Sequence, residues 1–141
     1  MRKSKTRNRI FLILNTVIPL LVGGVLYYLF CPNVYFVKLI DLVLGGGIHI
    51  SYTSSIWRKL ARNYLFDFFW AYSFTSAMSA IVNNKVFRIV VSILFICTLE
   101  ILQKFFTKLG TFDFVDLLVE ICAIFIVWLE LTVRGKANEK I

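Results

Sequence analysis

Four long apolar runs limit how this chain can fold more than any other feature of its sequence. The first occupies residues 10–30 and carries no charged residue. A helix of about 20 apolar residues matches the roughly 30 Å hydrocarbon core of a bilayer. Runs of similar length follow at residues 65–82, 86–106 and 114–133. The sequence therefore predicts an all-α fold, a polytopic membrane protein in which four transmembrane helices form a bundle, as one domain over residues 1–141.

The overall composition supports a lipid environment. Hydrophobic residues make up 59% of the chain and charged residues 17%, whereas a soluble domain carries about 45–50% apolar and about 25% charged residues. A chain of 141 residues could not bury so much apolar surface in a core of its own. The first apolar run follows a basic stretch, as in a signal peptide, but it is too long and lacks a small-residue cleavage site. We therefore expect it to remain as a span.

The net charge of +8 comes from basic residues placed beside the predicted spans. Lysine and arginine are enriched at the cytoplasmic ends of spans and beside anionic lipid headgroups. With the N-terminus inside, ten of the 16 basic residues fall on the cytoplasmic side and six on the other. The sequence thus predicts a protein of the inner (plasma) membrane with both termini in the cytoplasm. Its partner is the lipid bilayer, and no nucleic acid is expected.

Residues 31–64 are predicted to form a long outer loop between the first two spans. Within it, residues 34–44 are apolar but too few to cross a bilayer, so we expect an interfacial or re-entrant helix. Lys38 and Asp41 are spaced to pair on its wet face. The three glycines at 45–47 predict a helix stop, because they are not followed by the GK[ST] that a phosphate loop requires.

Histidine and cysteine give no indication of a metal centre or a catalytic site. His49 is the only histidine and is expected to be solvated in the outer loop. Cys31, Cys97 and Cys122 lie in or beside apolar runs without metal-ligand spacing, so we predict packing roles and no disulfide framework. The sequence holds no hydrolase or nucleotide-binding motif. These absences favour a non-enzymatic protein without excluding a carboxylate-based site, and we expect no cofactor, with a divalent cation as the one candidate left open.

Small residues in the first two spans predict close helix packing. Pro19 and the Gly23-Gly24 pair are expected to kink the first span or to let a neighbour approach it. The second span is rich in alanine and serine, at positions Ala71, Ser73, Ser76, Ala77, Ser79 and Ala80.

Polar residues concentrate in the later spans, where a carboxylate is unfavourable unless it is paired, protonated or wetted. They are Asp67, Glu100, Gln103, Asp113, Asp116 and Glu120. Glu100 and Gln103 share one face of the third span, and the three acidic residues of the fourth share another. We predict a polar pocket that opens outward and binds a ligand or ion, with Glu100 and Glu120 at its floor and the other acidic residues at its rim. The alternative is that Glu100 and Gln103 only hydrogen-bond to the fourth span.

Part of this pattern resembles a known family. Glu100-x-x-Gln103, followed by the Gly-Thr-Phe-Asp-x-x-Asp of residues 110–116 and an apolar helix, is similar to the VanZ-like family of small bacterial membrane proteins. The stretch 65–70 also resembles that family, and the likeness covers about half of the chain. It implies a polytopic cell-envelope protein. The family's namesake is linked to low-level teicoplanin resistance, and short members are sometimes labelled magnesium–citrate transporters.

The sequence leaves three functions open. The first is a binding or modifying protein of the cell envelope, whose outward carboxylate pocket holds a cation or a polar headgroup. The second is a small secondary transporter for an ion or an organic acid, alone or as a homo-oligomer. The third is a non-catalytic scaffold of a larger membrane complex.

Overall fold

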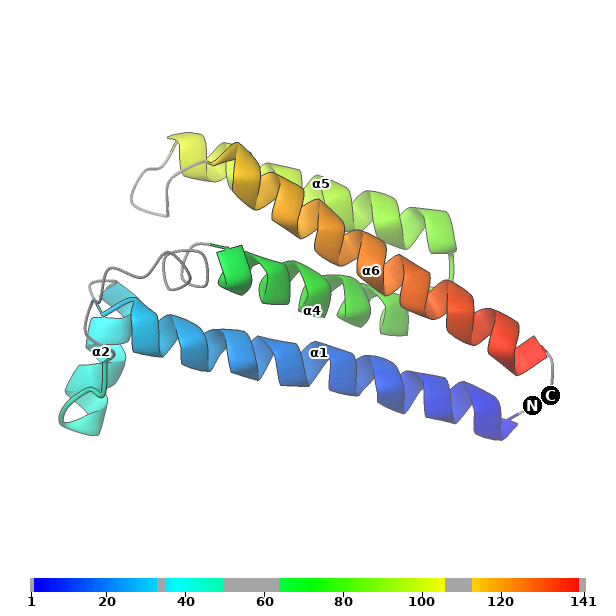
Figure 1. Cartoon of the computed structure of the whole chain (residues 1–141), viewed down its shortest axis with the longest axis horizontal. Coiled ribbons are helices and arrows are strands. Elements are labelled where there is room, and N and C mark those ends of the chain that lie inside the picture. Colours follow the sequence, from blue (N-terminus) through cyan, green and yellow to red (C-terminus); the bar gives the residue numbers. More distant parts are fainter. Residues whose placement is uncertain (1, 33–34, 50–63, 106–112, 140–141) are drawn as a thin grey trace.

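The computed structural model describes residues 2–32, 35–49, 64–105 and 113–139. Every regular element within these ranges is a helix, which confirms the all-α prediction. The helices of the described residues are α1 (Arg2–Phe30), α2 (Tyr35–Leu44), α4 (Phe66–Ile81), α5 (Lys85–Phe105) and α6 (Phe114–Glu139) (Figure 1).

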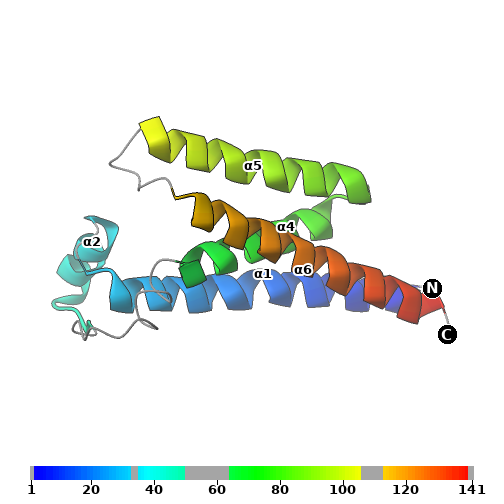
Figure 2. The same cartoon turned by 45° about the horizontal axis from the view of Figure 1, so that its top comes forward.

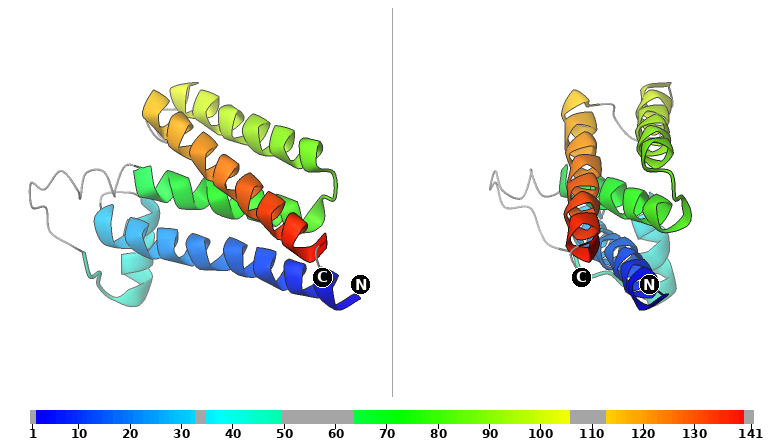
Figure 3. Two further views of the ribbon diagram at one scale, coloured as in Figure 1. Left: turned by 45° about the vertical axis from the view of Figure 1, so that its right-hand side comes forward. Right: turned by 90° about the vertical axis from the view of Figure 1, so that its right-hand side faces the viewer.

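Four of these helices lie lengthwise in the molecule, and α4 is the central one. It contacts α1, α5 and α6, and α5 also contacts α6. Successive long helices run in opposite directions, so both termini lie at the same end of the molecule (Figure 1). Figures 2 and 3 show α1 and α5 on opposite sides of α4. We call the end that holds the termini the terminal end, and the opposite end, which holds α2, the loop end.

The long helices lie where the spans were predicted, but not all of them have the length and apolarity of a membrane span. Within the described residues, two stretches are long and apolar enough to cross a membrane, Ile10–Phe30 of α1 and the whole of α5, Lys85–Phe105. In contrast, α4 has 16 residues, or about 24 Å, and is shorter than a bilayer core of about 30 Å. α6 has 26 residues; it begins where predicted but continues past residue 133, through the charged C-terminal stretch.

The distribution of side chains is the reverse of that in a soluble protein. Large apolar side chains face outward on α1, α5 and α6, where Leu21 is 63%, Leu94 61% and Phe125 55% exposed. Among the described residues, buried polar or charged side chains outnumber buried apolar ones. The buried polar residues are Ser73, Thr75, Ser76, Ser79, Arg88, Ser92, Glu100 and Glu120. This pattern is typical of proteins whose surface contacts hydrocarbon, because polar groups are stable there only inside the protein.

α1 approaches α4 closely at one glycine. A Cβ atom on Gly23 would lie 3.1 Å from the Cβ of Phe69, whereas a Cβ on Gly24 would meet nothing within 4 Å. The predicted close approach is therefore confirmed at Gly23, and α1 continues through Pro19 as one helix.

On its other side, α4 packs on α5 and α6 through a small apolar core. The rings of Phe74 and Phe95 stack there with 4.2 Å between centroids. The residues of this core are Ala71, Ile96, Ala123 and Ile124. The predicted small-residue face of α4 is largely buried, at Ala71, Ser73, Ser76 and Ser79. Small side chains let the backbones of neighbouring helices come close, which is how helices associate in lipid.

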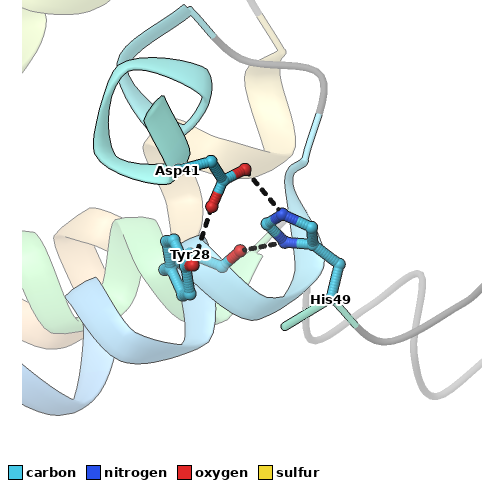
Figure 4. Close-up of polar contacts among 3 residues, drawn as sticks. All are labelled: Tyr28, Asp41 and His49. Carbon is cyan, nitrogen blue, oxygen red and sulfur yellow. Dashed lines mark hydrogen bonds and ion pairs between the residues drawn. The ribbon is translucent and has the colours of Figure 1, made fainter. Parts of the chain in front are cut away.

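Three residues hold α2 against the end of α1, and we call them the Tyr28 clasp (Figure 4). The Tyr28 hydroxyl donates to Asp41 Oδ1 at 2.7 Å, and His49 Nε2 lies 2.8 Å from Asp41 Oδ2. His49 Nδ1 lies 3.2 Å from the carbonyl oxygen of Tyr28. Both ring nitrogens thus face oxygen acceptors.

The clasp shows that two predictions were wrong. Lys38 does not pair with Asp41, because the two carboxylate oxygens bond to Tyr28 and His49 instead. His49 is not merely solvated, since it connects the segment after α2 to Tyr28 of α1. The hydrogen bond from Tyr28, followed by that from His49, holds the pKa of Asp41 below its ordinary value.

The glycines after α2 form the helix stop that the sequence predicts. α2 has 10 residues, too few to cross a bilayer core, and ends at Leu44. Gly45 and Gly46 follow with φ of 75° and 147°, a region of backbone conformation that favours glycine. At Gly47 a Cβ atom would collide with the carboxylate of Asp41 and the ring of His49. The absence of a side chain at this position therefore lets the clasp close.

Candidate functional site

Acidic side chains from three helices come together near the loop end of the bundle. Asp67 lies in the first turn of α4, Glu100 near the end of α5, and Asp116 and Glu120 in the first two turns of α6. Because α5 runs opposite to α4 and α6, these positions lie at similar levels (Figure 1). Each carboxylate interacts electrostatically with at least two of the others. We call these four residues the carboxylate cluster.

The two glutamates of the cluster are almost completely buried. Glu100 is 4% and Glu120 3% exposed. Each has an Oε2 atom that is buried and has no hydrogen-bond partner among the described residues, and Oδ1 of Asp116 is in the same state. Glu100 and Glu120 lie about 8–9 Å from the ends of their helices. An uncompensated carboxylate at such a place costs several kcal/mol, so the cluster requires protons or a cationic group.

Asp113 lies at the edge of the cluster and has a second role. It is exposed, and its Oδ1 accepts a hydrogen bond from the backbone N–H of Val115 at 3.0 Å, so it caps the first turn of α6. Its charge also acts on Glu100 and Asp116. The sequence pattern placed Asp113 on the pocket rim but did not indicate the cap.

Gln103 lies half-buried one turn after Glu100 on α5. The structure shows no hydrogen bond from Gln103 or Glu100 to α6 within the described ranges, so the contact that would make them structural links is not seen there. Of the cations predicted to lie near these residues, Arg62 and Lys108 are outside the described residues, and Lys104 is exposed in the last turn of α5.

Buried hydroxyl groups lie on the same helices, between the cluster and the terminal end. Ser73, Thr75 and Ser76 follow Asp67 along α4, and Ser92 precedes Glu100 on α5. The hydroxyl oxygens of all four are buried and unpartnered among the described residues. Ser76 lies about 7 Å before the end of α4, and Ser92 lies about 11 Å after the start of α5. These two helix ends adjoin each other, so the two serines lie at similar depth. Polar groups thus continue from the cluster into the bundle interior.

A second polar group lies nearer the terminal end, and the sequence did not reveal it. The Tyr72 hydroxyl donates to the carboxylate of Glu130, at 3.0 Å from Oε1 and 2.8 Å from Oε2. Asn15 Nδ2 donates to Tyr72 at 2.7 Å and to Glu130 Oε2 at 3.0 Å. These three residues link α1, α4 and α6. The sequence feature that could have indicated this group is Glu130, a lone acidic residue in the second half of an apolar run.

The carboxylate cluster can bind protons, metal cations or organic cations, because carboxylates are their usual protein ligands. Within the described residues, no three histidine, cysteine, aspartate or glutamate side chains are arranged to hold a metal ion. The cluster therefore gathers carboxylates without a formed metal centre in the part of the chain that the structure describes. No protein-family model, curated protein or solved structure matches this chain, so its function has to be inferred from the chemistry of these residues.

Proposed function

We propose that this chain is a four-span membrane protein whose carboxylate cluster binds a cation. The reversed distribution of side chains supports membrane insertion, because Leu21, Leu94 and Phe125 would otherwise face water. α1 and α5 each offer a stretch of sufficient length and apolarity. In this proposal α4 and α6 complete the four spans.

The short helix α4 and the charged helix α6 fit a membrane interior because neighbouring helices pack against them. α4 contacts the other three long helices, and a span that is surrounded by neighbouring helices need not match the full bilayer thickness. Glu120 of α6 is 3% exposed and faces protein instead of lipid, as ionisable residues in membranes do. The length of α4 and the charge of α6 are thus compatible with spans.

The proposed topology places both termini in the cytoplasm, at the inner membrane of a bacterial cell. Four spans return the chain to its starting side, and the termini lie at one end of the molecule (Figure 1). The basic residues of the terminal end favour the cytoplasmic side. The carboxylate cluster then lies in the outer half of the bilayer. The resemblance to the VanZ-like family favours the same location and stays a prediction.

A single observation carries the binding proposal: Glu100 and Glu120 are buried together, and each has an oxygen without a hydrogen-bond partner among the described residues. Asp67 and Asp116 add their charges to the same region. Four carboxylates in a low-dielectric site repel one another, and a bound cation removes both the repulsion and the burial penalty. The site therefore selects cationic groups, such as a metal cation or an ammonium, over neutral or anionic ones.

The test is a measurement of thermal unfolding in nanodiscs against a panel of Mg²⁺, Na⁺ and ethanolamine. A cation at about 100 times its Kd should raise the free energy of unfolding by roughly 2.7 kcal/mol. The double variant Glu100→Gln, Glu120→Gln should be more stable without cation, because it lacks the buried charges, and should not respond to it. Glu139→Gln makes the same chemical change at the last residue of α6 and should respond like the natural protein. Equal responses in all three proteins would rule out binding at the cluster.

The buried hydroxyls favour transport as a second candidate function. Ser73, Ser76 and Ser92 extend the polar interior from the cluster toward the terminal end, as an ion path would require. If the protein transports the cation, vesicles containing it should accumulate cation faster than empty vesicles. Replacing Ser76 and Ser92 together with alanine should slow that flux while leaving the unfolding response to cation unchanged. Binding without any flux above empty vesicles would exclude transport and leave a binding protein.

A further inference from the structure

A cavity of about 460 Å³ lies between α1 and α6 near the terminal end, away from the carboxylate cluster. Its lining combines polar and apolar side chains. The residues that line it are Phe11, Asn15, Leu129, Glu130, Val133 and Arg134. A cavity with both kinds of lining fits a ligand that has a charged group and an apolar part.

Arg134 provides a cation with free hydrogen-bond donors in this cavity. Its Cζ atom lies 3.2 Å from the centroid of the Phe11 ring, so the guanidinium is stacked on the aromatic face. Stacking fixes the plane of the guanidinium and leaves the N–H groups at its edge available. In the part of the chain that the structure describes, Arg134 makes no ion pair with a carboxylate. Its charge is thus available to an anion.

Arg134 has no ion-pair partner among the described residues, and the reason lies one turn earlier on α6. A glutamate and an arginine four residues apart on a helix commonly pair. Here both oxygens of Glu130 accept hydrogen bonds from Tyr72 instead, and Oε2 also accepts one from Asn15. Glu130 is therefore fixed in the wall of the cavity and directed toward α4.

The surroundings of the cavity match a phosphate group joined to hydrocarbon. In the sequence, basic residues are frequent near both ends of the chain, and both ends lie at the terminal end of the bundle (Figure 1). Leu129 is 41% and Val133 66% exposed beside Arg134. A second cavity of about 200 Å³ shares Asn15 with the first and continues along α1 to Pro19 between mainly apolar side chains. The apolar path thus starts beside the cation and leads deeper into the bundle.

We propose that this groove binds one phospholipid from the leaflet at the terminal end. Arg134 donates to oxygens of the lipid phosphate, and an acyl chain lies along Val133 and Leu129 toward Asn15. Basic pockets between transmembrane helices bind lipid headgroups in this way, and arginine recognises phosphate through paired donors. The proposal depends on insertion of the chain in a membrane, but not on cation binding at the carboxylate cluster.

Native mass spectrometry of the protein in detergent tests the proposal. Phosphatidylglycerol should bind the natural protein with a stoichiometry of one, and dioleoylglycerol, which lacks phosphate, should not. Arg134→Gln should weaken phosphatidylglycerol binding roughly tenfold or more. Lys85→Gln is the matched control, because it removes one exposed positive charge at the same end of the bundle, outside the groove. Equal weakening by both substitutions would overturn the proposal, since it would show only a general effect of charge.

Two further arms separate the alternatives. Val133→Trp fills the groove without changing charge and should also exclude the lipid, with helix content unchanged by circular dichroism. Lipid retention by this variant would contradict the assigned groove. Glycerol phosphate, the headgroup without acyl chains, should not displace the lipid at equal concentration. Displacement would assign the cavity to free phosphate instead. A chain that stays soluble and folded without detergent would refute membrane insertion itself, independently of these results.

Discussion

The packing of α1 on α4 can be tested at a pair of adjacent glycines that differ only in what they face. Gly23 lies against Phe69, where even a Cβ atom would come within 3.1 Å of the neighbouring Cβ. A Cβ atom on Gly24 would meet no other atom within 4 Å. Leucine at either site raises helix propensity by nearly the same amount. The difference between the two variants therefore reports the contact with α4 alone.

The expected difference follows from the lack of space at Gly23. Extra carbon atoms in a closely packed contact cost about 1–3 kcal/mol, because backbone or side chains must move. Gly23→Leu should accordingly be about 1–3 kcal/mol less stable than Gly24→Leu. For a chain of this size such a difference lowers Tm by roughly 3–12 °C.

The assay is thermal unfolding of the detergent-solubilised variants, followed by near-ultraviolet circular dichroism. Far-ultraviolet spectra serve as the control, because both variants should keep their helix content. Equal melting temperatures for the two variants, or a lower one for Gly24→Leu, would refute the α1–α4 packing described here.

Three other predictions concern the outer segment, the second polar group and the topology. Because the folded pKa of Asp41 is depressed, its contribution to the Tyr28 clasp is present above its ordinary pKa and is lost as pH falls through the lower folded value. The protection factors of the α2 amides, which compare the observed exchange rate with the intrinsic rate at the same pH, should therefore fall below about pH 4. Protection factors that stay constant from about pH 5 to about pH 2 would contradict this. Tyr72→Phe removes the hydroxyl whose single proton is shared between the two oxygens of Glu130. It should lower the free energy of unfolding by about 1–3 kcal/mol, measured by denaturation in detergent. A loss below about 0.5 kcal/mol would show that Glu130 does not depend on Tyr72. The topology can be tested by cysteine labelling in a chain whose three natural cysteines are replaced by serine. A cysteine at the exposed Ile48 should react with an impermeant maleimide in intact cells, whereas a cysteine at the exposed Asn83 should react only after permeabilisation. The opposite labelling result would invert the proposed topology.

Much of the helix arrangement could be predicted because it depends on local properties of the chain. The length of an apolar run decides where a long helix lies, and residues 10–30 match the apolar part of α1. The glycines at 45–47 end α2, since the conformation after the helix favours glycine. The gathering of Glu100 and Glu120 also follows from local spacing, once α5 and α6 are taken as antiparallel neighbours.

The contacts that the sequence did not predict depend on distant parts of the chain. Asn15 and Glu130 are 115 positions apart, and no periodicity connects them. Asp41 had a suitable cation three residues away in Lys38, but the fold brings His49 and Tyr28 to it instead. Local spacing identifies candidate partners, whereas the tertiary structure decides which of them pair.

We propose above that the buried carboxylate cluster binds a cation within the membrane. Infrared difference spectroscopy of the protein in nanodiscs tests it most directly, because a cation that contacts a carboxylate shifts its antisymmetric stretching band. Addition of the cation that stabilises the protein should produce this shift in the natural chain and in Glu139→Gln, and should produce none in the Glu100→Gln, Glu120→Gln double variant. An unchanged carboxylate band in the natural chain, or the same shift in the double variant, would contradict the claim.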